Sequence, residues 1–282
     1  DVQAHARELV EALFRNIPCG VGSRRKDFKL DQKELKRVLA DGVQWTLKHG
    51  YGNTEDRDHI EAEGCIANAD PDQVGDRALE RGRAQLGTLG SGNHFVEVGY
   101  VKEIYDADTA AVFGLEKDQA TVLIHTGSRG FGHEIADNYM KQAQKSGVKT
   151  PTKNLASFKI NSQEGQNYQK AMAAAANFAF ANRHLITHKL RQIWEEIFSG
   201  SNISLYYDLT HNIAKKEKIS GRQLLIHRKG AARLAEDGLA LIPGSMGTHS
   251  YLVKSANSEA TRLSYNSVAH GAGRKMGRRQ EK

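Results

Sequence analysis

The sequence of 282 residues contains only 2 cysteines and 4 prolines. Two cysteines cannot form a disulfide framework, and they leave no CxxC zinc motif. No stretch approaches the roughly 20 consecutive apolar residues that a membrane-spanning helix needs. These absences argue against a disulfide-stabilised secreted protein and against membrane association, and they favour a reducing, cytoplasmic compartment.

Acidic residues are fewer than basic ones, with Asp+Glu 33 against Lys+Arg 40 and a formal net charge of +7. A surplus of this size favours a polyanionic partner such as nucleic acid, although many basic proteins bind none. Hydrophobic residues make up 39% and charged residues 26% of the chain. These proportions are ordinary for a globular protein and exclude a disordered or collagen-like chain.

Helical and strand-like patterns are interspersed without regular alternation. Apolar spacing and capping boxes predict helices over residues 2–17, 31–48 and 161–198. A segment rich in Gly, Asp and Asn, residues 50–71, indicates a loop. Strand-like runs cover residues 95–101, 120–125, 203–209, 223–227 and 239–242. No repeat or linker divides the chain, so we expect a single α+β catalytic domain over residues 1–282.

Five of the 12 histidines stand where a strand-like run or a glycine turn ends. A strand end holds a side chain firmly, and a glycine turn lets backbone N–H groups approach a ligand closely. Imidazole binds metals, accepts protons and attacks phosphorus. Any one of the five fits a half-buried structural histidine, but the set favours a site for a metal and a phosphate. The five are His94, His125, His211, His227 and His270.

Three glycine-rich turns have the composition of an anion cradle, because small residues and hydroxyls lie beside free N–H groups. None matches a Walker A or dinucleotide-binding motif, so each alone is no better than an ordinary turn. The turns cover residues 90–93, 127–130 and 243–247. Arginines adjoin these turns and either neutralise phosphate charge or keep the surface soluble.

Two further patterns favour ordinary structural roles. His184 and His188 lie four residues apart on the long predicted helix, a spacing that can bind a metal. They have no acidic partner in the motif, so we expect a packed or capping face. For the run Lys215, Lys216 and Lys218 we expect a solvated surface.

Taken together, these motifs resemble the RtcB family of RNA ligases. The resemblance runs from one end of the chain to the other and keeps the family's motif order, which makes it far stronger than any single motif. The segments that carry it are QLGTLGSGNHFVEV (85–98), LIHTGSRGFGH (123–133), AANFAFANR (175–183), DLTHNIAKKE (208–217), HRKGA (227–231), LIPGSMGTHSYLV (241–253) and HGAGRKM (270–276).

The resemblance implies an enzyme that joins an RNA 3′-phosphate or 2′,3′-cyclic phosphate to a 5′-hydroxyl, as in tRNA splicing and RNA repair. The family uses GTP and Mn²⁺. A histidine attacks the α-phosphate of GTP, the guanylyl group passes to the RNA 3′-phosphate, and the 5′-hydroxyl displaces GMP. The implied partners are tRNA halves or broken RNA, and an archease-type activating protein.

Carried onto this sequence, the resemblance assigns roles residue by residue. His270 would be the guanylylated nucleophile, and the metal ligands would be His94, His125 and His211. The nucleotide-binding positions would be Asn93, Glu97, Asn212, Ser245, Ser250, Gly271, Ala272 and Gly273. RNA or phosphate would be held by Arg129, Arg228 and Arg274.

The sequence departs from the family pattern near both ends. The family's metal-binding DxxCG motif is missing, since neither Cys19 nor Cys65 has an Asp three residues before it. The chain also ends soon after His270, where family members continue. We therefore expect the central portion of an RtcB-type protein, with weak activity or none in this chain. Two alternatives stay open: an RtcB-like protein that only binds RNA or nucleotide, and a metal-dependent phosphoesterase.

Overall fold

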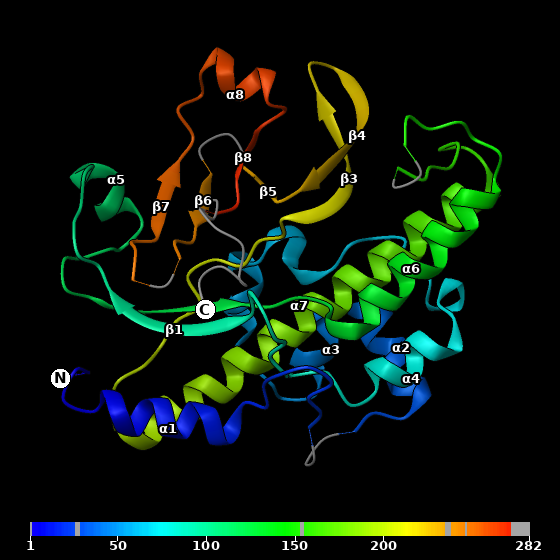
Figure 1. Cartoon of the computed structure of the whole chain (residues 1–282). Helices are drawn as coiled ribbons and strands as arrows, with labels where there is room; N and C mark the ends of the chain where they lie inside the picture. The colour runs from blue at the N-terminus through cyan, green and yellow to red at the C-terminus, as the bar shows by residue number, and fades with distance from the viewer. Residues whose placement is uncertain (1, 26–28, 153–154, 235–237, 246, 272–282) are drawn as a thin grey trace. The chain divides into compact units, whose positions relative to one another are not determined.

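A computed structural model describes residues 2–25, 29–152, 155–234, 238–245 and 247–271. The chain divides into two compact units, Asp1–Asp208 and Leu209–Lys282. Helices and small antiparallel sheets are mixed along it, which confirms the predicted α+β class (Figure 1). The single domain expected over the whole chain stays a prediction. No helix among the described residues has the length and apolarity to cross a membrane.

The first unit is organised by one long helix, α7 (Gln163–Ile197). In Figure 1 it runs through the whole unit. Its middle is Ala-rich and buried on most sides, so neighbouring helices approach it closely. The helices that pack on it are α1 (Ala6–Asn16), α2 (Gln32–Asp41), α3 (Val43–Lys48) and α6 (Arg129–Lys145).

Two apolar clusters hold these helices together. One surrounds Phe131 of α6 and Phe178 of α7, whose rings lie 4.9 Å apart. It also includes helix α4 (Asp76–Gly82), which packs on α6. The other cluster joins Leu9 of α1 and Ile186 of α7 to apolar side chains of a two-stranded sheet. The core of the first unit therefore lies along both sides of α7.

That sheet consists of β1 (Phe95–Tyr100) and β2 (Ala120–His125), paired antiparallel. Helix α5 (Ala107–Val112) lies in the connection between the two strands. Both strands confirm their predicted positions to within one residue. The strand expected over residues 203–209 is wrong, because among the described residues this segment pairs only through a single bridge from Asp208 to Ile60.

The reason for that missing strand lies in its neighbour. Residues around Ile60 coil into short 3₁₀ turns and offer no straight edge for a ladder. These turns are η1 (Thr54–His59) and η2 (Glu61–Gly64), followed by η3 (Pro71–Gln73). The loop predicted over residues 50–71 therefore consists of tight turns without an α-helix.

Helix boundaries follow the predicted caps with two corrections. The carboxylate of Asp31 accepts from the Glu34 N–H at 2.7 Å and begins α2 as predicted. The helix expected over residues 31–48 breaks at Gly42, which has φ of 56° and where a Cβ would lie 2.2 Å from the Gly64 carbonyl oxygen. The cap of α7 is Ser162, one residue later than expected, because its hydroxyl accepts from Gly165 N–H.

The second unit is built from short antiparallel pairs. Strands β3 (Asn212–Ile219) and β4 (Arg222–Lys229) form a hairpin whose two-residue turn, Ser220–Gly221, has positive φ at both positions. Such a turn matches the natural twist of paired strands. The other pairs join β5 (Ala231–Arg233) to β8 (Ser267–Ala269) and β6 (Leu239–Ile242) to β7 (Tyr251–Lys254), with α8 (Glu259–Leu263) before β8.

Candidate active site

Two of the predicted metal ligands meet at one end of the β1–β2 sheet. The antiparallel register pairs Phe95 with His125, so His94, just before β1, lies beside His125 at the end of β2. The rings of Phe95 and His125 touch edge to face at 5.3 Å. The strand ends therefore bring these two imidazoles together, and their role as metal ligands stays a prediction.

His94 is fixed by the glycine turn before it. The backbone N–H of Gly90 donates to His94 Nδ1 at 2.9 Å, and the Thr126 hydroxyl lies 3.1 Å from the same nitrogen. Burial lowers the pKa of His94 to about 4, helped by the positive charge of Arg129 and by His125. The imidazole is therefore neutral at neutral pH, with its lone pair on Nδ1.

Gly90 is required by the close approach of its neighbours. A Cβ at this position would lie 2.1 Å from His94 Nδ1 and 2.3 Å from Arg129 Nη1. The turn over residues 90–93 thus packs backbone directly against an imidazole and a guanidinium. The turn has the composition of an anion cradle, and in the structure Gly90 makes room for the His94 ring and the Arg129 guanidinium. Anion binding by this turn stays a prediction.

Arg129 opens α6 with an unusual backbone, a φ of 54°. Its guanidinium donates to the Thr88 hydroxyl at 3.0 Å, to the Ser23 hydroxyl at 2.9 Å and to the Gly20 carbonyl at 3.1 Å. All three partners are neutral, and no carboxylate among the described residues forms an ion pair with it. A half-buried cation with neutral partners can bind an anion, and the binding of phosphate by Arg129 stays a prediction.

Asn182 of α7 positions both loops of this site, and the sequence analysis did not single it out. Its Oδ1 accepts from the N–H groups of Gly87 at 2.7 Å and Thr88 at 3.0 Å. Its Nδ2 donates to the carbonyls of Thr88 at 3.2 Å and Gly127 at 3.1 Å. The sequence does contain a sign of this role. Asn182 lies in a helical segment rich in Ala and Phe, and a polar side chain buried there needs hydrogen-bond partners.

Arg183, the next residue of α7, was also missed. Its Nε donates to both carboxylate oxygens of Asp208, at 2.7 and 2.9 Å, and its Nη1 donates to the Thr126 carbonyl at 3.2 Å. Burial raises the pKa of Asp208, and the positive charge of Arg183 opposes that rise. Arg183 thereby ties the end of the first unit to the residue that follows His125.

In the second unit, the predicted nucleophile His270 follows β8. Its Nδ1 lies 2.8 Å from the carbonyl oxygen of Gly230. A carbonyl oxygen only accepts, so Nδ1 carries the ring proton and Nε2 keeps a lone pair. Gly230 has φ of 64°, and a Cβ there would approach the His270 ring to 3.3 Å. The glycine therefore sets both the position and the tautomer of the imidazole.

His211 and Asn212 lie beside this histidine. The rings of His211 and His270 stack at 4.5 Å with an angle of 29°. Asn212 Oδ1 accepts from the Gly230 N–H at 2.9 Å, so the amide holds the same glycine that orients His270. The structure thus brings together a predicted nucleophile, a predicted metal ligand and a predicted nucleotide-binding residue.

The glycine turn after β6 contains the two predicted serines. Ser250 Oγ accepts from the Gly244 N–H at 3.0 Å, and the Ser245 N–H donates to Thr248 Oγ1 at 2.8 Å. Both serines are exposed. A Cβ on Gly271 would lie 3.2 Å from the Pro243 carbonyl oxygen, so this turn passes close to the residue after His270.

The remaining predicted site residues differ in their burial and in their contacts. Arg228 is buried, pairs with both carboxylate oxygens of Glu217, and donates to the Ser267 hydroxyl and the Tyr265 carbonyl. These contacts make it a packing residue, and its phosphate binding stays a prediction. Asn93 and Glu97 are exposed in the first unit. Ala272, Gly273 and Arg274 lie outside the described residues.

His94 and His125 supply two nitrogen donors for a metal. Neutral imidazole suits Mn²⁺, which also takes oxygen ligands. Either the ring proton of His94 or its bond from Gly90 has to move when a metal binds. No group of three or more metal-binding side chains occurs among the described residues. The pair therefore fits Mn²⁺ as part of a coordination shell.

Neither cysteine adds to that shell in the structure. Burial raises the pKa of the Cys65 thiol, and the nearby charge of Asp41 adds to the rise. Its Sγ donates to the Ala40 carbonyl at 3.3 Å. Cys19 is exposed. The thiol of Cys65 is thus a protonated packing group and not a thiolate ligand.

The histidine pair of α7 belongs to a structural network. His184 Nε2 lies 3.0 Å from Asp56 Oδ2, and His184 Nδ1 lies 2.7 Å from Thr46 Oγ1. His188 Nδ1 accepts from the Gly52 N–H at 3.1 Å. Each ring faces a different segment, as expected for a packed face and not for a shared metal.

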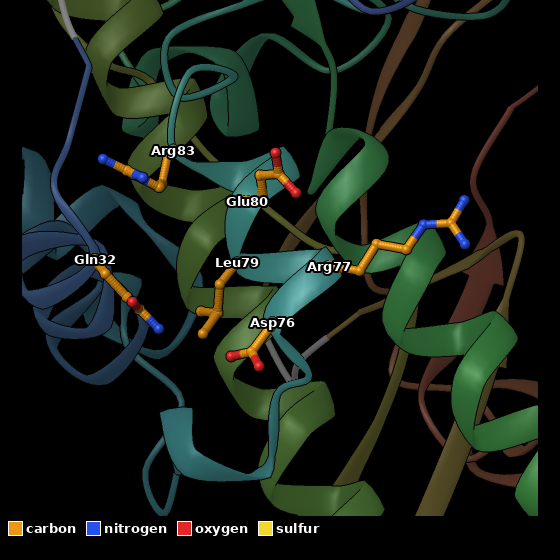
Figure 2. Close-up of a pocket in the computed structure, with 6 residues that line it drawn as sticks. All are labelled: Gln32, Asp76, Arg77, Leu79, Glu80 and Arg83. Carbon is orange, nitrogen blue, oxygen red and sulfur yellow. The ribbon is translucent and has the colours of Figure 1, made fainter.

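A shallow pocket of about 500 Å³ lies between α2 and α4, away from these residues (Figure 2). Its charged groups have both signs. Arg83 Nε already donates to the Leu30 carbonyl at 2.9 Å, and Arg77 pairs with Glu134 of α6 at 3.5 Å. The pocket is lined by Gln32, Asp76, Arg77, Leu79, Glu80 and Arg83. It contains none of the predicted site residues.

Comparison with known proteins identifies relatives along the whole chain. The family model described as tRNA-splicing ligase RtcB matches residues 1–282. The protein named tRNA-splicing ligase RtcB from Methanocaldococcus jannaschii is 44% identical over 99% of this chain and 31% of its own length. Proteins of the same name from Methanococcus maripaludis and Nanoarchaeum equitans are 43% and 45% identical, over 99% and 96% of this chain. The chain spans 63% and 61% of the length of these two relatives.

Proposed function

This chain belongs to the RtcB family, and from that membership we propose that it is the catalytic portion of a GTP- and Mn²⁺-dependent RNA ligase. The proposed substrates are an RNA 3′-phosphate or 2′,3′-cyclic phosphate and an RNA 5′-hydroxyl, with tRNA halves as the class that the relatives' name indicates. An archease-type activating partner and a cytoplasmic location belong to the same proposal.

The observation that carries the proposal is the tautomer of His270. Donation from Nδ1 to the Gly230 carbonyl places the lone pair of the neutral ring on Nε2, the atom that would attack phosphorus. In the proposed first step, Nε2 attacks the α-phosphorus of GTP. A P–N bond forms, the bond from the α-phosphorus to the bridging oxygen breaks, and pyrophosphate leaves. The carbonyl of Gly230 stabilises the positive charge that develops on the ring.

Neighbouring groups of the second unit support this step. Asn212 holds Gly230, and the stacked ring of His211 limits rotation of His270. The turn over residues 243–250 passes close to Gly271, which suits a nucleotide held by backbone groups and serine hydroxyls. We assign Ser245 and Ser250 to that role on this ground and on the resemblance.

The first unit supplies the groups for metal and phosphate. His94 and His125 would hold Mn²⁺ as part of its shell, and the ion would neutralise charge on the reacting phosphate. Arg129 would hold a phosphate oxygen, because its charge is balanced by no described carboxylate. In the later steps the guanylyl group passes from His270 to the RNA 3′-phosphate, and the 5′-hydroxyl oxygen then attacks that phosphorus and releases GMP.

The test is a labelling experiment with α-³²P-labelled GTP and Mn²⁺. We expect weak label on the chain, which is lost in acid and stable in base, as a phosphoramidate is. A His270→Ala variant should carry none. His133→Ala is the matched control, since His133 is exposed on α6 and pairs only with Asp137 among the described residues, and it should be labelled like the parent chain.

Two results would change the proposal. Equal label on the His270→Ala variant would place the nucleophile elsewhere. Absence of label from the parent, together with measurable GTP binding, would favour the alternative of a nucleotide-binding protein that lacks transferase activity.

A further inference from the structure

The β3–β4 hairpin turns one of its two faces to solvent. Side chains alternate between faces along a strand, so the register decides which residues share a face. One face contains Ile213 and Arg228, which are both buried, and it packs into the second unit. The solvent face carries Asn212, Ala214, Lys216, Lys218, Gln223, Leu225, His227 and Lys229.

The positive charges on this solvent face are not neutralised by ion pairs with other described residues. Lys216, Lys218 and Lys229 are exposed, and none forms an ion pair with another described residue. The only acidic residue of the hairpin is Glu217, which lies on the packed face and pairs with Arg228 and Arg233. The lysine run is predicted as a solvated surface, and the register places Lys216, Lys218 and Lys229 on one face and Lys215 on the other.

The face begins at the proposed nucleophile. Lys229 pairs with Asn212 across the hairpin and precedes Gly230, whose carbonyl holds His270. From there the face continues along both strands to the turn at Ser220–Gly221. Eight residues of antiparallel strand extend about 25 Å, enough for several nucleotides of a single strand.

We propose that this face binds the sugar–phosphate backbone of the RNA strand whose 3′-phosphate is delivered to His270. The inference rests on the proposed RNA-ligase function and adds to it the surface that holds the substrate. Lysine ammonium groups bind phosphate as point charges and read no sequence. The face carries no Phe, Tyr or Trp, so base stacking contributes little. Binding should therefore depend strongly on salt and weakly on sequence.

The experiment measures the affinity of the chain for a fluorescent single-stranded RNA with a 3′-phosphate, at several salt concentrations and without GTP. Each phosphate contact with single-stranded nucleic acid contributes about 0.7 to the slope of log affinity against log salt. A variant that combines Lys216→Gln, Lys218→Gln and Lys229→Gln should lower the slope by about 2. At about 0.1 M salt this corresponds to roughly 100-fold weaker binding.

The matched control combines Lys33→Gln, Lys141→Gln and Lys145→Gln, which removes the same charge from exposed helix positions of the first unit. It should keep the parent slope. A finer pair compares Lys218→Gln on the solvent face with Arg222→Gln, an exposed residue on the opposite face near the turn. Only Lys218→Gln should lower the slope, by about 0.7.

Three results would overturn the proposed surface: a hairpin variant with the parent slope, equal losses in hairpin and control variants, or a parent chain that binds no RNA. The binding assay contains no GTP, and the labelling test of His270 contains no RNA. Failure of the surface and failure of the guanylylation chemistry are therefore told apart.

Discussion

Asn182 carries four hydrogen bonds in a fully buried position, and both loops beside His94 and His125 depend on it. An Asn182→Ala variant leaves N–H and carbonyl groups of these loops buried without partners. Each such group costs about 1–3 kcal/mol, so we expect the free energy of unfolding to fall by at least about 3 kcal/mol. Urea unfolding measures the change.

The control for this prediction is Gln166→Ala on the same helix, where the side chain is exposed. Ala favours helix, so this variant should change stability by less than about 0.5 kcal/mol. A loss in Asn182→Ala no larger than that of the control would contradict the positioning role.

Gly90 gives a second prediction at the scale of one residue. In Gly90→Ala the new methyl group meets His94 and Arg129 well inside van der Waals contact. We expect a loss of about 1–3 kcal/mol from overpacking. Gly127→Ala is the comparison, since a Cβ there has no atom within 4 Å, and it should unfold at the parent urea concentration or above. Equal stability of the two variants would show that the 90–93 turn adapts freely.

Site residues were predictable from the sequence where their chemistry follows from the residue type and the local motif. Histidines at strand ends indicated a site, and the structure places His94 beside His125 and stacks His211 on His270. Arg228 shows the limit of that reasoning. The sequence motif is identical whether its arginine faces phosphate or the half-buried Glu217, and only the strand register distinguishes the two cases.

At the scale of elements, Asp56 joins the turn η1 to helix α7. Burial opposes ionisation of its carboxyl group, but hydrogen bonds from Arg191, His184 and the Asn53 N–H outweigh it and hold the pKa well below its usual range. The two nitrogens of Arg191 donate to the two carboxylate oxygens at 2.6 and 2.7 Å. The side chain of Asp56 is 4% exposed, so water screens the pair little.

An Asp56→Asn variant removes the buried charge and leaves the half-buried guanidinium of Arg191 without its carboxylate partner. We expect a loss of about 3–5 kcal/mol at neutral pH. Asp58→Asn, on the exposed side of the same turn, should lose less than about 0.5 kcal/mol. Urea unfolding of the three proteins side by side measures both changes.

The same pair predicts a pH dependence. A carboxyl group with a lowered pKa in the folded protein stabilises it above the unfolded pKa, which is about 3.9 for Asp, and this contribution falls as the pH drops further. The stability gap between the parent and Asp56→Asn should therefore be constant from pH 7 to about 5 and narrow below about pH 4. A gap that stays constant down to acid unfolding would show that the charge of Asp56 is not what stabilises the turn.

Helices and strands were predictable where short-range sequence patterns alone determine them. The cap at Asp31 and the strands β1 and β2 follow from short-range spacing, and the structure has them where expected. The break at Gly42 comes from contact with Gly64, far along the chain, and no local pattern contains it. Strand β3 was not predicted, because its lysines hide the alternation of buried and exposed side chains. The pairing with β4 shows that alternation.

At the scale of the whole molecule, the two units differ in the size of their cores. The two apolar clusters along α7 and a smaller one of Val43, Ile60 and Phe180 all lie within residues 1–208. The second unit buries few apolar side chains, among them Ile213, Leu239 and Ala240. A segment of that size with a small core is marginal by itself.

Tryptophan fluorescence tests this division, because both tryptophans, Trp45 and Trp194, belong to the first unit. We expect a chain of residues 1–208 to unfold in urea with the same fluorescence midpoint and slope as the whole chain. A midpoint that falls in the shorter chain would show that the second unit stabilises the first. Circular dichroism of the whole chain follows both units and should give a broader transition.

The order of motifs along the whole chain predicted the family, which the comparisons confirm. The division after Asp208 was not predictable, because no change of composition marks it. It arises from which residues share a core, and that depends on contacts between segments distant in sequence. Likewise, the roles of Asn182 and Arg183 depend on loops that lie more than 50 residues away along the chain.

Side chains of helix α7 reach several separate segments of the chain. Asn177 contacts Ile66, Asn182 contacts Gly87 and Arg191 contacts Asp56. An α-helix turns by about 100° and rises about 1.5 Å per residue. One inserted residue in its middle would rotate every later side chain away from its partner at once. Homologous chains should therefore vary in length within surface turns, such as residues 113–119, and keep the length of α7 unchanged.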